Sequence, residues 1–135
     1  MFNCSLMKFK EISDKYGSLT PIEGQVDIPF DIKRVYYITK VGKDVRRGFH
    51  AHRKLHQIVI CVNGSVKIKV KNLDGEEVVE LNDSTVGLYI GPYVWREMFD
   101  FSEESVLLVL ASEYYDENDY IRNYDFYLDE IRDRY

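Results

Sequence analysis

Hydrophobic and polar residues alternate in short runs along most of this chain. The pattern is clearest over residues 66–71, where Val66, Ile68 and Val70 alternate with lysines. Successive side chains of an extended strand point to opposite faces, so this run predicts a strand with one buried face and one charged, solvent-exposed face. Turn-forming residues interrupt such runs at intervals of about eight to twelve residues, which is typical of a β-sandwich or barrel.

A central strand is predicted over Gln57 to Val62, because the residues after Gln57 are apolar on both faces. It is followed by Asn63-Gly64, a pair that strongly favours a hairpin turn. Further strands are expected over residues 19–22, 32–39, 50–52, 65–71, 77–81, 86–90 and 105–112. With about eight to eleven strands in all, the predicted fold class is all-β, a double-sheet jelly-roll barrel.

The periodicity changes near the C-terminus. Ile121, Tyr124, Leu128 and Ile131 recur at steps of three and four residues, which is the spacing of one face of an α-helix. Asn118 is the predicted N-cap of this helix, because an Asn side chain can accept a hydrogen bond from a free backbone N–H of the first turn. The barrel is therefore expected to end in a C-terminal helix.

The composition places the chain among ordinary globular proteins. Its 135 residues, of which 45% are hydrophobic, suit one folded domain over residues 1–135. With 18 basic and 23 acidic residues the net charge is −5, which argues against a nucleic-acid-binding surface. The sequence contains 11 tyrosines. Because a tyrosine ring offers a flat apolar surface with a polar end, this excess suits a site for sugars or nucleobases as well as it suits β-strands.

Neither the cysteines nor the N-terminal residues indicate secretion. Cys4 and Cys61 are too few for a disulfide framework, and Cys61 lies within an apolar run, so both are expected to be reduced. The first residues lack the basic and apolar stretches of a signal peptide. The longest apolar run, Val106 to Ala111, is too short to cross a bilayer. We therefore expect a cytoplasmic protein with no membrane partner.

The most informative segment begins at His50. His50 and His52 are two residues apart, which places both imidazoles on the same face of a strand. Gln57 follows after four intervening residues, and Gly64 after six more. Cupin barrels use the similar pattern His-x-His-x4-Glu-x6-Gly to hold a transition metal. Where the second half of the cupin pattern has its third histidine ligand, this chain has Arg96.

Two departures from the cupin pattern remove its metal chemistry. Gln57 replaces an anionic carboxylate by a neutral amide, which can instead hydrogen-bond a ligand. Arg96 replaces an imidazole by a permanent cation that repels a divalent metal ion. We therefore expect no metal and no other cofactor. His50 and His52 are then free to accept and donate protons, which makes them candidate catalytic groups.

Further candidate residues lie close to this motif. Arg47 precedes a glycine, which lets backbone approach a ligand closely, and Arg47 and Arg34 are both predicted to bind a diphosphate. A surface ion pair is the alternative for each arginine. Tyr36 shares a strand face with Arg34 and is a candidate substrate contact, and Trp95 is predicted to form a wall of the site. His56 is expected to be structural.

Several segments resemble one family of sugar-modifying enzymes. Arg47-Gly48-Phe49-His50 is similar to the Arg-Gly-Leu-His segment of the dTDP-sugar epimerases that act on 4-keto-6-deoxy sugars. A fuller set of motifs resembles the dTDP-4-keto-6-deoxy-D-glucose 3,4-ketoisomerases of the cupin superfamily. These motifs are RGFHAH (47–52), VGLYIGP (86–92), LASEYYDE (110–117) and DYIR (119–122). The similarity extends from Phe9 to about Leu128.

The resemblance implies a metal-free cupin homodimer that moves the ketone of a dTDP-linked 4-keto-6-deoxy sugar from C-4 to C-3. It implies that His50 is the base that removes the C-3 proton and that His52 is a second acid/base group. Tyr16 and Arg96 resemble the branch of the family whose product has the gluco configuration, used to make 3-amino-3,6-dideoxyglucose. Tyr16 and Arg96 are then expected to shape the surroundings of C-4, which would be protonated from the side of the histidines.

Other functions remain open at this stage. The same isomerase with a galacto product is one alternative. A 3,5-epimerase would invert carbons without moving the ketone. A metal-dependent cupin dioxygenase or isomerase would need ligands that Gln57 and Arg96 do not supply. A non-catalytic cupin would bind the same sugar without converting it.

Overall fold

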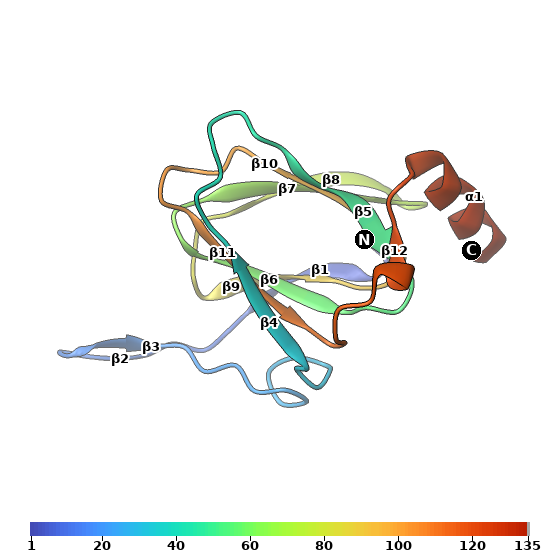
Figure 1. The fold of residues 1–135 in the computed structure, drawn as a ribbon. Coiled ribbons are helices and arrows are strands. Elements are labelled where there is room, and N and C mark those ends of the chain that lie inside the picture. The colour runs from blue at the N-terminus through green and yellow to red at the C-terminus, as the bar shows by residue number, and fades with distance from the viewer. Residues whose placement is uncertain (135) are drawn as a thin grey trace.

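Two five-stranded antiparallel sheets face each other in the computed structural model, which describes residues 1–134 (Figure 1). The first sheet contains, in spatial order, β1 (Cys4–Lys8), β9 (Val86–Ile90), β6 (Gln57–Asn63), β11 (Val106–Ala111) and β4 (Arg34–Ile38). The second sheet contains β12 (Tyr120–Ile121), β5 (Arg47–His52), β10 (Trp95–Phe99), β7 (Val66–Asn72) and β8 (Gly75–Leu81). The predicted all-β, double-sheet barrel is confirmed.

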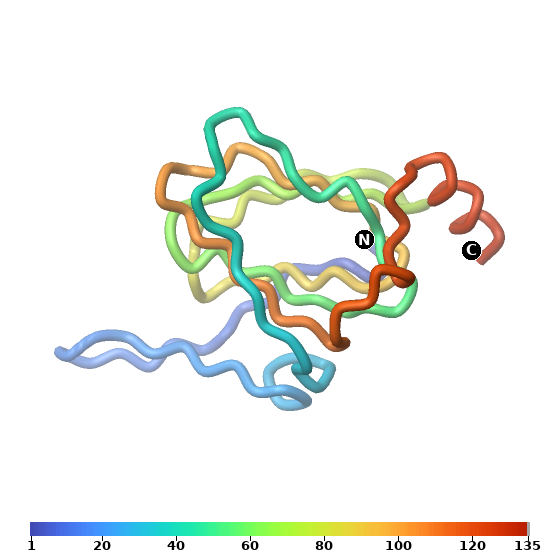
Figure 2. The backbone as a smooth tube through the Cα atoms, viewed as in Figure 1, coloured from blue at the N-terminus to red at the C-terminus, as the bar shows by residue number. Residues whose placement is uncertain are grey.

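Two elements lie outside the two sheets. A hairpin formed by β2 (Ile12–Asp14) and β3 (Gly17–Leu19) projects away from the barrel, as the backbone tube in Figure 2 shows. The C-terminal helix α1 (Tyr124–Arg134) follows the short 3-10 helix η1 (Glu117–Asp119) and lies at the opposite side of the molecule (Figures 1 and 2). The expected C-terminal helix is therefore present.

Apolar side chains fill the interior between the sheets. Val66, Ile68 and Val70 are fully buried, whereas the lysines between them are partly exposed, as the alternating pattern predicted. They belong to one cluster with Leu107 and Val109 of the facing sheet. Full burial of an apolar side chain of this size contributes about 1.5–3 kcal/mol to folding, so this cluster holds the two sheets together.

Strand β6 is the central strand that the apolar run predicted. It pairs with β9 on one side and with β11 on the other. Val59 and Cys61 belong to the cluster between the sheets, whereas Ile58 and Ile60 pack with Phe30 in a second cluster on the other face of the sheet. Because both faces are covered there, the strand has apolar residues at each position from 58 to 61.

A small polar group of side chains interrupts the core. His52, Gln57 and Arg96 are each no more than 2% exposed, although all three are polar or charged. They come from β5, β6 and β10 respectively. Burying such groups is unfavourable unless they are hydrogen-bonded, so this is where the structure departs most from a simple core.

The strand pattern differs from the prediction in two respects. Residues 1–134 contain twelve strands rather than about eight to eleven, and the strand expected over residues 19–22 is instead β3, which ends at Leu19. Strand β10 was missed because Trp95 and Arg96 are both buried. A buried arginine on the inner face removes the alternation of apolar and polar residues by which a strand is recognised.

The predicted N-cap of the helix is wrong. Asn118 lies inside η1, whose N-cap is Asp116, and Ile121 pairs with the edge of β5 as part of β12. Helix α1 begins at Tyr124, and the side-chain oxygen of Asn123 accepts a hydrogen bond from the N–H of Phe126 at 3.0 Å. No helix within residues 1–134 is long and apolar enough to span a membrane.

This correction predicts that Asn123→Ala destabilises the protein by about 1 kcal/mol, because a backbone N–H of the first helical turn loses its acceptor. The matched control is Asn118→Ala, in which the lost side chain caps nothing. Urea unfolding measures both free energies. Equal effects of the two substitutions would show that Asn123 does not cap α1.

Candidate active site

Strand β5 carries a bulge that turns its histidines toward the interior. Gly48 and Phe49 have positive φ angles of 92° and 57°, and the pairing with β10 shifts register between Arg96, which faces His50, and Glu97, which faces Gly48. A Cβ atom on Gly48 would lie 2.9 Å from the carbonyl oxygen of Arg96, so this position requires glycine. A bulge of this kind changes the direction of the side chains that follow it.

His50 and His52 lie side by side, as their spacing predicted. Their ring centroids are 4.9 Å apart, and the ring of Tyr120 lies 5.0 Å from His50 and 4.3 Å from His52. The Nδ1 atom of His50 is 3.0 Å from the carbonyl oxygen of Gly48, and Nδ1 of His52 is 3.2 Å from a carboxylate oxygen of Asp119. Because both partners are acceptors, each neutral ring carries its proton on Nδ1 and leaves Nε2 unprotonated.

Burial keeps both imidazoles neutral. Burial first, and then the charge of Arg96, lowers the pKa of His50 from 6.5 to about 3. The same two causes, in the same order, lower the pKa of His52. The Nε2 atom of His52 is buried and has no hydrogen-bond partner among residues 1–134. Both rings are therefore proton acceptors at neutral pH.

A chain of hydrogen bonds leads from Arg96 to the opposite sheet. Nη1 of Arg96 donates to Oε1 of Gln57, and Nη2 donates to the carbonyl oxygen of Val94 at 3.1 Å. This fixes the amide so that Nε2 of Gln57 donates to the hydroxyl oxygen of Tyr36 at 3.0 Å. Because that oxygen accepts the amide proton, the Tyr36 hydroxyl can donate its own proton to a third group.

The charges of this chain are set by burial. Burial lowers the pKa of Arg96 to about 10, so the guanidinium stays charged at neutral pH. Burial raises the pKa of Tyr36 more than Arg96 lowers it, so the hydroxyl keeps its proton. Arg96 donates hydrogen bonds to a neutral amide and to a peptide carbonyl. Its charge can therefore attract an anion that forms in the cavity.

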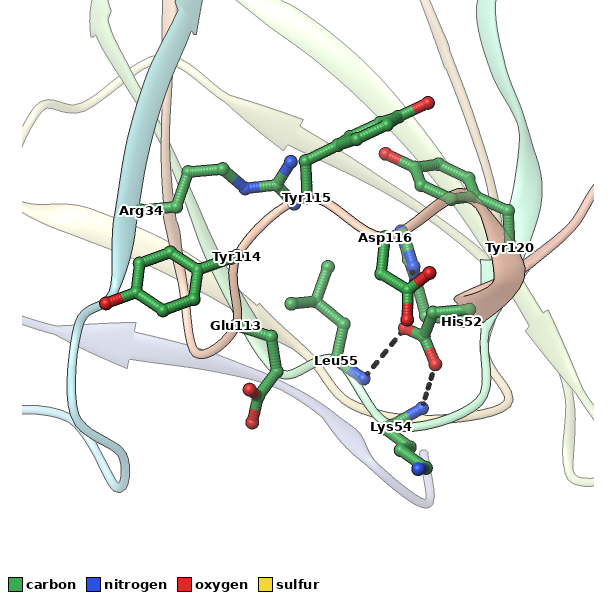
Figure 3. A pocket seen from close by; sticks show the side chains of 10 residues that line it. Arg34, His52, Lys54, Leu55, Glu113, Tyr114, Tyr115, Asp116 and Tyr120 are labelled. Carbon is green, nitrogen blue, oxygen red and sulfur yellow. Dashed lines mark hydrogen bonds and ion pairs between the residues drawn. The ribbon is translucent and has the colours of Figure 1, made fainter.

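Two neighbouring cavities open beside these groups and share Arg34 and Tyr120. One has a volume of about 490 Å³ and is lined by His50, Tyr36 and the arginines 34, 47 and 122, with no acidic residue in its wall. The other has a volume of about 550 Å³ and is lined by His52, Tyr115 and Asp119 of the 3-10 helix, among others (Figure 3). The first cavity combines a proton acceptor, His50, with a hydroxyl donor, Tyr36, and a positive wall.

The arrangement does not suit a metal ion. Within residues 1–134 no group of three His, Cys, Asp or Glu side chains lies close enough together to hold one. The positions of two cupin ligands are occupied by Gln57 and Arg96, and the guanidinium donates to the amide oxygen that would otherwise face the metal. A fixed cation in that place opposes a divalent ion.

The structure brings most of the predicted site residues together. Arg47 and Arg34 line the 490 Å³ cavity with Tyr36, and the guanidinium of Arg34 lies 5.3 Å from the centre of the Tyr36 ring. Trp95 is not in this group. It lies on the other face of β10 and packs against Tyr124 of α1.

Two further residues lie apart from the cavities. Tyr16 is at the turn of the β2–β3 hairpin and is 85% exposed, so within one chain it does not reach the cavity. His56 hydrogen-bonds the hydroxyl of Tyr89 at 2.7 Å and packs near Phe30 on the outer face of the sheet, in keeping with a structural role.

Sequence reasoning assigned no role to three residues that the structure places in the site. Tyr120 covers both histidines, Asp119 contacts His52, and Arg122 lines the cavity. All three belong to the segment 119–122, which the motif comparison had singled out. Their roles were not visible because the segment reaches the histidines only through the pairing of β12 with β5.

Comparison with known proteins identifies relatives over almost the whole chain. The family model FdtA, described as WxcM-like, C-terminal, matches residues 2–132. A TDP-4-oxo-6-deoxy-alpha-D-glucose-3,4-oxoisomerase of Aneurinibacillus thermoaerophilus is 51% identical over 120 residues, which are 89% of this chain and 86% of that protein.

Solved structures agree with this similarity. The sugar 3,4-ketoisomerase QdtA of Thermoanaerobacterium thermosaccharolyticum, in complex with TDP, is 71% identical, with a TM-score of 0.97 over 100% of this chain and 98% of that one. A histidine-to-asparagine mutant of QdtA in complex with TDP-4-keto-6-deoxyglucose is 70% identical, with the same TM-score of 0.97 and the same coverage of 100% and 98%.

The buried histidines predict a loss of stability below neutral pH. In the unfolded chain each imidazole has a pKa of about 6.5. In the folded protein the pKa of His50 is about 3, and that of His52 is also lowered. Between these values the unfolded state binds more protons. The free energy of unfolding therefore falls as the pH falls, by at most about 1.4 kcal/mol per pH unit for each group.

Urea unfolding at about pH 7 and about pH 5.5 measures this dependence. His50→Asn and His52→Asn each remove one titrating group, so each variant should lose less stability between the two pH values than the wild type. The same pH dependence in wild type and both variants would mean that the two imidazoles have the same pKa in the folded and the unfolded protein, and would contradict the lowered pKa values.

Proposed function

The chain belongs to the WxcM-like, C-terminal family and is an isomerase of TDP-linked keto sugars, a TDP-sugar 3,4-ketoisomerase, and from this premise we propose a specific reaction. The substrate is TDP-4-keto-6-deoxy-D-glucose, the product is TDP-3-keto-6-deoxy-D-glucose, and the reaction proceeds by acid/base enolisation without a metal. The product then supplies the synthesis of 3-amino-3,6-dideoxyglucose. Residues 1–135 act as one cupin-like sugar-isomerase domain in the cytoplasm.

The observation that carries this proposal is that neutral His50 and the hydroxyl donor Tyr36 line one cavity, with neutral His52 in the adjoining one. His50 lies on β5 in one sheet and Tyr36 on β4 in the other, and both line the 490 Å³ cavity. A keto-isomerisation needs a group that accepts a proton from one carbon and a group that donates a proton to its neighbour. No redox cofactor is needed, because the ketone itself acidifies the adjacent C–H bond.

In the first step, Nε2 of His50 removes the proton from C-3, and the electron pair of that bond shifts to the C-4 carbonyl oxygen. The negative charge that develops on the enediolate is stabilised by the fixed charge of Arg96, which has no carboxylate partner among its assigned hydrogen bonds. The pKa of His50 is low because burial and Arg96 disfavour the imidazolium, and the enediolate formed beside it offsets that penalty.

In the second step the intermediate is protonated at C-4, and the C-3 hydroxyl proton passes to the C-4 oxygen. H-3 of the substrate and H-4 of the gluco product lie on opposite faces of the ring, so the proton cannot arrive from the side on which His50 removed it. The expectation that the histidine side delivers this proton fits the galacto product instead. Tyr36 faces His50 from the other sheet and keeps its proton, so we assign the delivery to its hydroxyl and the transfer between the oxygens to His52. Proton exchange with solvent as the product leaves returns His50 to its neutral form and the Tyr36 oxygen to a hydroxyl.

The remaining parts of the substrate fit the arginine-lined wall. Arg34, Arg47 and Arg122 line the same cavity, and guanidinium groups bind diphosphates through paired hydrogen bonds. The tyrosine rings beside them offer a surface for the thymine base. Binding energy from the nucleotide would then position the sugar between the two sheets.

The role expected for Tyr16 requires a second copy of the chain. All residues of β2 and β3 are exposed, including the apolar Ile12 and Leu19 at 58% each. An isolated two-stranded hairpin is at best marginally stable in water, and exposed apolar residues favour contact with another surface. We therefore assign a homodimer in which the hairpin packs on the partner subunit and brings Tyr16 toward the partner's cavity, where it and Arg96 shape the surroundings of C-4.

Incubation with TDP-4-keto-6-deoxyglucose, followed by proton NMR, tests the reaction. We expect the ketone to move to C-3, with the large H-4 coupling of an equatorial hydroxyl and with full activity in EDTA. A small coupling would identify the galacto product, inverted carbons with the ketone still at C-4 would identify an epimerase, and no change would leave a sugar-binding cupin. Loss of activity in EDTA that added metal restores would contradict the metal-free mechanism.

Two variants test the assigned roles. His50→Asn and Tyr36→Phe should each lower kcat by about 10²–10⁴-fold, because each removes one proton-transfer group, while TDP binding changes little. Tyr124→Phe is the matched control, since Tyr124 packs on Trp95 away from the cavity. Undiminished turnover by His50→Asn would exclude His50 as the base.

The dimer proposal predicts one species of twice the chain mass, 2 × 16.0 kDa, by light scattering at micromolar concentration. Replacing the exposed Ile12 and Leu19 by serine should shift the protein toward monomer and lower activity. In the intact dimer, Tyr16→Arg combined with Arg96→His should change the H-4 coupling of the product, whereas Lys67→Ala should not. A monomeric wild type with full activity would contradict both assignments.

A further inference from the structure

One carboxylate joins three N–H donors at the edge of the site. Asp119 is the last residue of η1, and its Oδ1 accepts a hydrogen bond from the backbone N–H of Lys54 at 2.8 Å. Its Oδ2 accepts from the N–H of Leu55 and from Nδ1 of His52, both at 3.2 Å. Figure 3 shows the two backbone bonds in the turn beside His52. The same carboxylate therefore ties the turn after β5 and orients an imidazole.

From this geometry we propose that Asp119 is a positioning residue for the ketoisomerase reaction. It holds His52 with its proton on Nδ1, so that Nε2 faces the cavity as a proton acceptor, and it stabilises the imidazolium that forms when His52 carries a proton between the two sugar oxygens. The second role, stabilisation of the imidazolium, rests on the proposed function.

The tautomer decides whether His52 can carry that proton. With Nδ1 protonated, Nε2 accepts the proton of the C-3 hydroxyl while O-3 becomes the carbonyl oxygen. The resulting imidazolium then gives the proton to the C-4 oxygen, so His52 ends the cycle unchanged. With the proton on Nε2 instead, the ring cannot accept a hydroxyl proton from the cavity. Nε2 of His52 is buried without a partner among residues 1–134, so no hydrogen bond within that part of the chain competes with the substrate for this atom.

The surroundings of His52 make a carboxylate necessary for this role. Burial is the largest cause that disfavours a positive charge on this ring and so lowers its pKa, followed by Arg96, His50, Arg34 and Arg122. Asp119 is the acidic group in direct contact with the imidazole, and its side chain is only 13% exposed. A carboxylate hydrogen-bonded to Nδ1 offsets part of that repulsion when the ring takes up a proton, as the aspartate of a Ser-His-Asp triad does for its histidine.

The two histidines differ in their Nδ1 partners, and this difference separates their roles. His50 donates to the neutral carbonyl oxygen of Gly48, whereas His52 donates to the carboxylate of Asp119. The positive charge that His50 gains as the base is stabilised by the enediolate beside it, so His50 needs no second anion. A group that carries a proton between two oxygens of the substrate must be stabilised as a cation from behind.

Nitrogen-15 NMR of the resting protein tests the tautomer directly. The chain has 3 histidines, so histidine-specific labelling yields three rings, which His50→Asn and His56→Gln assign. We expect a pyrrole-type Nδ1 and a pyridine-type Nε2 for His52, with the Nδ1 proton further downfield than that of His50. A His52 ring that carries its proton on Nε2 would overturn the inference without any variant.

Asp119→Asn provides the second measurement. The shortest contact of the side chain is the one from Lys54, so the amide oxygen stays there and the amide NH₂ faces Nδ1 of His52. The ring proton should then move to Nε2, and kcat should fall by about 10²–10⁴-fold with little change in KM. Asp125→Asn, an exposed residue six positions later on α1, is the matched control and should keep both values.

The outcomes separate this inference from the proposed function. A variant that keeps the Nδ1-protonated ring, or that switches tautomer without losing kcat, would show that Asp119 only ties the turn. A protein that does not isomerise the sugar, but whose His52 ring switches tautomer in Asp119→Asn, would refute the proposed function and retain the positioning. The tautomer is read without substrate, so the two failures cannot be confused.

Discussion

The buried guanidinium of Arg96 is the charge on which the site depends. Arg96 is 1% exposed, and its assigned partners are the neutral amide of Gln57 and the carbonyl of Val94. An isolated buried ion is unfavourable, and the fold accepts this cost within a core that is otherwise apolar. The charge opposes binding of a divalent metal ion, adds to burial in lowering the pKa values of both histidines, and fixes the amide that in turn donates to Tyr36. Burial and this one charge together keep the two imidazoles neutral.

Local patterns predicted the barrel well because the apolar residues of a strand follow which of its faces are buried, one face in β7 and both in β6. The run 66–71 and the run that became β6 could be interpreted from alternation and apolar content alone, and both are confirmed. The spacing of His50 and His52 fixed their common face for the same reason. The misplaced N-cap has a different origin: Ile121 repeats at helical spacing with the residues that follow, but it is buried as part of β12. Periodicity indicates which residues are buried. Two consecutive elements of different type can have buried residues at the same spacing, as β12 and α1 do here.

The parts of the site that local patterns did not predict depend on tertiary pairing. Trp95 and Arg96 are adjacent, so they point to opposite faces of β10, and only one of them can face the cavity. Tyr36 was expected as a substrate contact, but the donor role that we propose for it rests on the direction of a hydrogen-bond chain that crosses from one sheet to the other. The same holds for Asp119, which is separated from His52 by 67 positions in sequence.

The short strand β12 also covers the edge of β5, and it is synthesised after the strand that it covers. Residues 119–122 supply the ring over the histidines, the carboxylate behind His52 and one arginine of the cavity wall, and they lie within the last part of the chain. Until they leave the ribosome, β5 has β10 on one side and an open edge on the other, and open edges pair readily with other chains. A nascent barrel thus carries both imidazoles on an unpaired edge strand, and the segment that completes the candidate site is also the one that covers this edge.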